Sequence, residues 1–126
     1  MKEPWIVLVA GPYRSGTGDD PQKIAENLAR LEAGAWEVWQ RGHVPVIGEW
    51  LALPLVRRSG LRPEDEGWQT TVYGVAHRLL GRCDAVLRLP GASRGADADV
   101  ALAQRRGLPV VTSALDLPLV RAEGSL

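Results

Sequence analysis

Short apolar runs alternate with helical stripes along this chain, and this alternation constrains the fold more than any other feature. Residues 5–10 form a continuous apolar run that ends at a Gly-Pro pair, which predicts a strand buried on both faces. The segments 43–47, 84–89 and 108–112 are also predicted to be short strands. Because the segments between these runs are too long for hairpins, the strands are expected to be parallel, with helices covering both faces of the sheet.

Helices are expected in three of the intervening segments. The first begins at Asp20-Pro21, an N-cap followed by proline, and ends at the basic residue before Gly42. The second begins within 62–66, with proline first and acids in its opening turn, and ends at Gly81. The third carries a stripe of small residues and stops before Gly107.

Residues 48–62 remain unassigned, since Pro54 and Gly60 interrupt their apolar pattern. The tail after residue 112 is expected to add a last strand or a helical turn. We therefore predict a single Rossmann-like (flavodoxin-like) α/β domain over residues 1–126, with a parallel sheet of four or five strands. Right-handed crossovers favour the strand order 2-1-3-4.

Composition excludes several classes of protein. The 126 residues suffice for one domain. Fifteen basic and fifteen acidic residues balance, which argues against a nucleic-acid partner. One cysteine and two histidines allow neither an internal disulfide nor a common structural zinc site, and no metal or cofactor is expected. The first residues carry an acid before a short apolar run, so we expect no signal peptide, no membrane segment and a cytoplasmic protein.

Ligands of parallel α/β sheets bind at the carboxyl ends of the strands, which directs attention to the loops 11–20 and 90–97. The first loop is rich in glycine and is typical of a turn that holds an anion through backbone N–H groups and Arg14. The alternative is a flexible connection in which Arg14 is merely solvated. Thr17 stands where a P-loop needs its lysine, so ATP hydrolysis of that type is not expected.

The second loop contains Gly91-Ala-Ser93-Arg-Gly95, which formally fits the nucleophile elbow of α/β-hydrolases. That triad needs a histidine downstream of the serine, whereas His43 and His77 both lie upstream. A serine hydrolase is therefore rejected, and His43 is expected to be a core or strand-edge residue.

Two acids follow this loop and have more than one interpretation. Asp97 and Asp99 are both expected in the first turn of the third predicted helix. Carboxylates there are stabilised by the helix dipole, so each is open to a purely structural explanation.

Four segments in order resemble the nucleoside 2-deoxyribosyltransferase-like superfamily, in particular its small members of the domain-of-unknown-function type. They are AGPYRSG, GHVPV, CDAVLRLPG and SRGADADVALAQRRGLPVV, and the similarity spans about residues 5–112. The resemblance implies cleavage or exchange of the N-glycosidic bond of a (deoxy)nucleoside or a nucleoside 5′-monophosphate. A carboxylate attacks the anomeric carbon, and a covalent sugar ester forms and is then resolved, as in retaining glycosidases.

The resemblance also implies roles for individual residues. Asp99 falls at the position of the family's glutamate nucleophile, and Ser93 at the position that holds the 5′-phosphate. The residues assigned to substrate binding are Gly11, Tyr13, Arg14, Ser15, Gly16, Ser93, Gly95 and Ala96. The further candidates are His77, Tyr73 and Asp97.

Two positions depart from the family pattern. Asp99 is one methylene shorter than glutamate, a retreat of about 1.5 Å. Ala76, with His77 beside it, stands where the family tends to place an aspartate.

Three functions remain open at this point. The leading one is an N-glycosidase or deoxyribosyltransferase, and Arg14 and Ser93 favour a phosphorylated substrate and hydrolysis. The second is a non-catalytic nucleotide-binding module of the same fold. The third is a structural or partner-binding subunit whose five tryptophans supply the surface. Tryptophans and apolar stripes also predict a homodimer or larger assembly, and Trp50 and Trp68 are expected to line a base-binding pocket.

Overall fold

The computed structural model describes residues 3–120 and shows an α/β architecture with one parallel sheet. Within that range the sheet has four strands, β1 (Ile6–Ala10), β2 (Val44–Val46), β3 (Ala85–Arg88) and β4 (Val110–Val111). Their order is β2-β1-β3-β4, which confirms the predicted parallel Rossmann-like sheet and its strand order.

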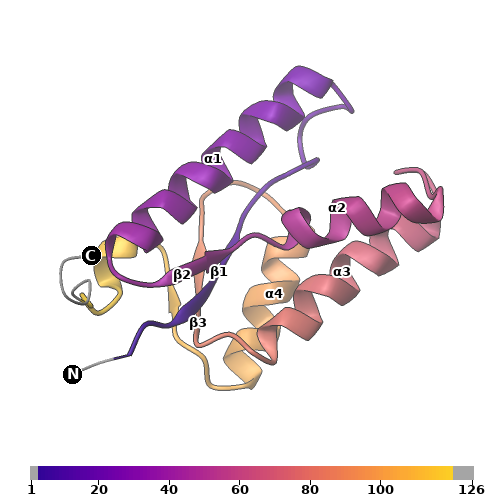
Figure 1. Cartoon of the computed structure of the whole chain (residues 1–126). Coiled ribbons are helices and arrows are strands. Elements are labelled where there is room, and N and C mark those ends of the chain that lie inside the picture. Colours follow the sequence, from indigo (N-terminus) through magenta and orange to yellow (C-terminus); the bar gives the residue numbers. More distant parts are fainter. Residues whose placement is uncertain (1–2, 121–126) are drawn as a thin grey trace.

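Helices cover both faces of this sheet (Figure 1). They are α1 (Pro21–Gln40), α2 (Gly48–Ser59), α3 (Glu66–Leu80) and α4 (Arg94–Arg105), with a 3₁₀ turn, η1 (Ala114–Asp116), near the end of the described chain. Val7 and Val9 of β1 face α1 and η1, whereas Leu8 and Ala10 face α3 and α4. The strict alternation of side chains along β1 therefore divides the core into two layers.

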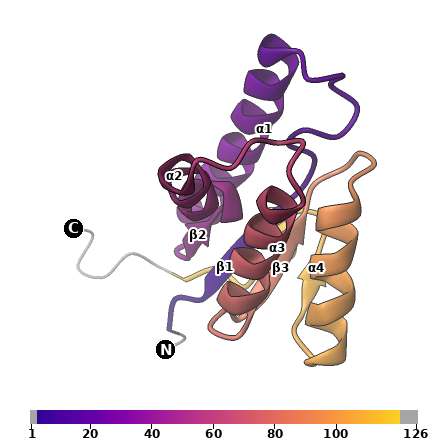
Figure 2. The same ribbon diagram turned by 90° about the vertical axis from the view of Figure 1, so that its right-hand side faces the viewer.

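Helix α2 is the element that the sequence left unassigned. Pro54 lies inside it, where proline removes a backbone donor and disfavours a helix. The helix forms because Ala52 and Val56 are fully buried, and α2 packs along α3 (Figure 2). Gly60 then ends it with a φ of +79°, in the left-handed region. Burial of one side of α2 thus outweighs the local effect of Pro54 against a helix.

Helix α3 begins later than the sequence predicts. The expected start placed Pro63 first and the acids in the opening turn, but the helix starts at Glu66 with Asp65 as its N-cap residue. The preceding residues form a turn instead, in which Asp65 Oδ2 accepts a hydrogen bond from the Arg62 backbone N–H at 2.8 Å. In the tail, η1 is the expected helical turn, and residues 121–126 lie outside the described range.

His43 is a buried structural residue, as expected, rather than a base. Its Nδ1 accepts a hydrogen bond from the Trp5 backbone N–H at 2.9 Å. The proton is therefore on Nε2, which donates to the Pro118 carbonyl at 2.6 Å. The ring thus ties the start of β1 to the tail. Across residues 3–120, no helix combines the length and the apolar character needed to cross a membrane.

Candidate functional site

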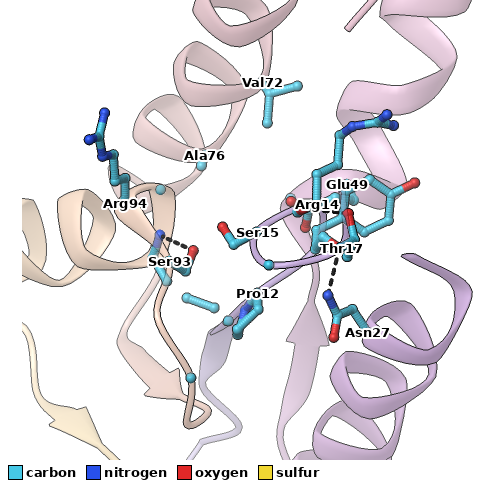
Figure 3. A pocket seen from close by; sticks show the side chains of 18 of the residues that line it. Pro12, Arg14, Ser15, Thr17, Asn27, Glu49, Val72, Ala76, Ser93 and Arg94 are labelled. Carbon is cyan, nitrogen blue, oxygen red and sulfur yellow. Dashed lines mark hydrogen bonds between the residues drawn. The ribbon is translucent and has the colours of Figure 1, made fainter. Parts of the chain in front are cut away.

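A cleft of about 1420 Å³ opens where β1 and β3 end, at the carboxyl edge of the sheet. Its walls are the loop after β1, the loop between β3 and α4, the start of α2 and one side of α3 (Figure 3). This is where ligands of parallel α/β sheets bind. The two loops selected from the sequence therefore meet around one cavity.

The structure brings most of the predicted site residues together. All the residues assigned to substrate binding line the cleft, and so do Asp99 and Tyr73. His77 and Asp97 are not among the residues that line it. Figure 3 shows Ser15 pointing from the first loop toward the start of α4, where Ser93 lies. The roles assigned to these residues remain predictions.

The first loop is fixed by its own hydrogen bonds and by α1. Thr17 Oγ1 donates to the Arg14 carbonyl at 2.6 Å, and the buried Asn27 donates from Nδ2 to the Tyr13 carbonyl at 2.8 Å. Arg30 in turn donates to Asn27 Oδ1. Sequence reasoning missed Asn27, although a polar residue on the apolar side of a helix is a signal for such a contact.

Arg14 is held at the rim of the cleft. Its guanidinium pairs with Asp19 at 2.9 Å and lies over the Trp68 ring, 5.8 Å from the ring centroid. Arg14 therefore has partners within the protein, in addition to its contact with solvent. Trp68 lines the cleft, as expected. Trp50 does not line it, because its indole Nε1 donates to Glu32 on α1 at 3.1 Å.

The second loop is organised by Arg88, the last residue of β3. Its guanidinium donates to the Leu89 and Gly91 carbonyls and pairs with Asp97 at 3.0 Å. Gly91 has a φ of +112°, and a Cβ there would lie 2.8 Å from Pro12 Cγ, so the two loops touch at this glycine. Sequence reasoning missed Arg88, whose signal is a charged residue at the end of a buried strand.

Ser93 is the N-cap of α4. Its Oγ accepts a hydrogen bond from the Ala96 backbone N–H at 3.1 Å. The hydroxyl proton remains able to donate to a ligand oxygen. Gly95 is small for a packing reason, because a Cβ there would lie 3.2 Å from Tyr73 Cε1.

The two acids of α4 have different surroundings. Asp97 lies in the first turn, its side chain is 73% exposed, and it pairs with Arg88. Asp99 lies in the second turn and is buried, so its expected place in the first turn is wrong. Since the dipole effect fades beyond the first turn, it does not explain the presence of Asp99.

Burial dominates the electrostatics of Asp99. The pKa of this carboxyl is raised to about 7: burial is the largest cause, the charge of Glu49 also raises it, and the charge of Arg88 lowers it. His77 Nε2 lies 3.6 Å from Asp99 Oδ1, which is too long for a hydrogen bond. His77 thus lies next to Asp99, although it is not among the residues that line the cleft.

Glu49 is the cleft residue that sequence reasoning overlooked. It lies in the first turn of α2 and lines the cleft, and burial raises its pKa. Burial also raises the pKa of Tyr13, with Arg14 lowering it and Glu49 raising it, so Glu49 acts on both Tyr13 and Asp99. The available signal was an acid three residues after the end of strand β2, at the carboxyl edge of the sheet.

The cleft thus combines the buried carboxyl of Asp99 and the half-buried carboxyl of Glu49 with hydroxyls, aromatic rings and arginines. In residues 3–120, no group of three or more His, Cys, Asp or Glu side chains is placed to hold a metal ion. Ala76, where the family resemblance implies an aspartate, lines the cleft without offering a polar group. No family model and no curated protein matches this chain.

Proposed function

We propose that this protein cleaves or exchanges the N-glycosidic bond of a nucleoside or nucleoside 5′-monophosphate, with Asp99 as the nucleophile. The observation that carries the proposal is the placement of Asp99. It is a buried carboxylate in the wall of a cleft large enough for a nucleotide, and neither the helix dipole nor a hydrogen-bonded partner accounts for it. The resemblance of the chain to the deoxyribosyltransferase-like superfamily supports the same role.

In this reaction a carboxylate oxygen of Asp99 attacks the anomeric carbon of the sugar. The C–N bond breaks, its electron pair stays on the base, and a sugar ester of Asp99 forms. Water then attacks the same carbon and releases the sugar and the Asp99 carboxylate, or a second base attacks it and the product is a new nucleoside. The ionised form of Asp99 is the reactive one, so its raised pKa makes the rate sensitive to pH near neutrality.

The polar rim of the cleft suits a 5′-phosphate. Arg14 and the amino end of α4, capped by Ser93, line the same cavity, and a guanidinium and a helix dipole both favour an anion. Trp68 and Tyr73 supply aromatic faces for the base. We also propose that the protein acts in the cytoplasm.

Product analysis tests this proposal. The purified protein is incubated with nucleosides and their 5′-monophosphates, with and without a second base, and the products are separated by chromatography. We expect free base from the monophosphates, at a lower rate from the nucleosides, and no requirement for the second base. Binding of nucleotides without any base release would contradict the enzyme and support the non-catalytic binding module. A new nucleoside formed only with a second base would indicate a transferase.

We also propose that the chain forms a homodimer. Trp36, Trp39 and Trp50 are 59%, 58% and 42% exposed, so they do not fill the core. They lie on α1 and α2, and the hydrogen bond between Trp50 and Glu32 brings the two helices together. Exposed tryptophans gathered in one region are typical of a protein interface.

Light scattering measures this assembly directly. The wild type is expected to give a particle of twice the 13.7 kDa chain mass at micromolar concentration. Trp39→Glu is expected to shift it to the single chain mass, because a charge cannot be buried unpaired in an interface. Leu115→Glu, at a residue 75% exposed on η1, is the control and leaves the mass unchanged. A wild-type particle of 13.7 kDa would contradict the proposal.

A further inference from the structure

Glu49 is a second carboxylate in the wall of the cleft, and it comes from a different element than Asp99. It is the second residue of α2, which starts two residues after β2 ends. A Cβ at Gly48 would lie 3.6 Å from the Ala76 Cβ, so the start of α2 sits closely against α3. This packing directs the first turn of α2 to the cleft that Asp99 also lines.

The position of Glu49 in a first helical turn does not explain why its half-buried side chain lines the cleft. An acid there favours the helix dipole from solvent, as the exposed Glu66 does in the first turn of α3. Glu49 instead lines the cleft, and none of the ion pairs among residues 3–120 includes it. Partial burial of a carboxylate without a paired cation costs free energy, and carboxylates with such raised pKa values in a cleft are typical of functional sites.

Glu49 and Asp99 are electrostatically coupled. Burial raises the pKa of both, and the charge of Glu49 raises that of Asp99 further. The negative charge of Glu49 therefore hinders ionisation of Asp99, so the two carboxyls act on each other within the same cleft.

Other charged groups surround this pair. His77 of α3 and Arg88 of β3 face Asp99, the first at 3.6 Å and the second through its charge. The charges of Arg14 and Arg57 lower the pKa of Tyr13, and the charge of Glu49 raises it. Any pH profile of the site includes these groups.

We propose that Glu49 is the acid–base catalyst of this site, working with Asp99 as nucleophile; this rests on the proposed function. In the first step the Glu49 carboxyl gives its proton to the departing base as the C–N bond breaks and Asp99 bonds to the anomeric carbon. In the second step the Glu49 carboxylate takes a proton from the attacking water, and the bond to Asp99 breaks. Glu49 ends protonated and Asp99 ends ionised, so the cycle closes without another reactant.

The experiment compares Glu49→Gln with the wild type on two nucleotides, with the protein in excess, so that only the first release of base is measured. On an ordinary purine 2′-deoxynucleoside 5′-monophosphate, we expect base release to fall on the order of 10²–10³-fold, because the leaving base has lost its proton donor. On the 7-methylated purine analogue the base leaves as a neutral molecule without a proton, so we expect a loss of only a few-fold. Glu66→Gln is the matched control, since it removes an exposed first-turn acid outside the cleft, and it leaves both rates unchanged.

A titration provides a readout besides turnover. Carboxyl carbon NMR of Asp99 is expected to show a lower pKa in Glu49→Gln than in the wild type, because the neighbouring charge is gone. Glu66→Gln is expected to leave the pKa of Asp99 unchanged.

The outcomes separate the two proposals. Equal losses on the two nucleotides, or no loss on either, would overturn the role of Glu49 and leave the proposed reaction in place. Absence of base release by the wild type from either nucleotide would overturn the proposed reaction and the role of Glu49 with it. An unchanged pKa of Asp99 in Glu49→Gln would overturn the coupling of the pair.

Discussion

Asp99→Asn is expected to lower base release on the order of 10³-fold or more, because a neutral amide cannot serve as the attacking carboxylate. The same change is expected to raise the free energy of unfolding at pH 8, on the order of 2 kcal/mol. Rates of base release and urea denaturation measure the two effects. Opposite signs for activity and stability distinguish a buried nucleophile from a residue that supports the fold.

The sign of the stability effect follows from the direction of the pKa shift. The carboxyl of Asp99 has a pKa of about 7 in the folded protein, against 3.8 for the free group. The contribution of Asp99 to the free energy of unfolding is therefore largest below pH 3.8, where the group is protonated in both states. This contribution is lost as the pH rises from 3.8 to 7, because the unfolded state ionises before the folded state does. Asparagine does not titrate, so the variant lacks this decline and is the more stable protein at pH 8.

Two further variants complete the test. Asp97→Asn, two residues earlier on the same helix but outside the cleft, is expected to keep turnover. Asp99→Glu restores the reach of the family's glutamate and is expected to retain turnover. If Asp99→Asn kept the wild-type rate, the nucleophile assignment would be wrong while the fold and the cleft stood.

Gly42→Ala is expected to destabilise the protein by about 3–5 kcal/mol, without involving the cleft. Gly42 follows the end of α1 with a φ of +95°, and an added Cβ would lie 1.9 Å from the Val120 carbonyl oxygen. The backbone N–H of Val120 also donates to the Arg41 carbonyl at 2.9 Å. The tail therefore cannot move away from an added methyl group without breaking this hydrogen bond. Thermal or urea denaturation measures the loss.

Gly107→Ala is the matched control for this change. Gly107 also follows a helix, has a φ of +73°, and an added Cβ there meets no atom within 4 Å. Its cost is therefore the backbone strain alone, about 1 kcal/mol. Equal losses in the two variants would show that contact with the tail contributes nothing at Gly42.

The sequence by itself determined the parallel sheet, its strand order and the edge at which the site lies. These follow from local signals, because a doubly buried strand must be apolar throughout and the two loops must leave the sheet at its carboxyl edge. Asp20 as N-cap and the left-handed Gly42 were also readable, since capping and positive φ depend on neighbouring residues.

Only the tertiary structure decided the elements and residues that depend on distant contacts. Pro54 argues locally against a helix, and α2 exists because its buried side lies along α3. The same packing brought Glu49 into the cleft, where its charge acts on Asp99, which is fifty residues away in the sequence. A hydrophobic pattern shows which face of an amphipathic segment is buried. The partner of that face is decided by the tertiary fold. The pKa of a buried carboxyl likewise depends on the groups that the fold places around it.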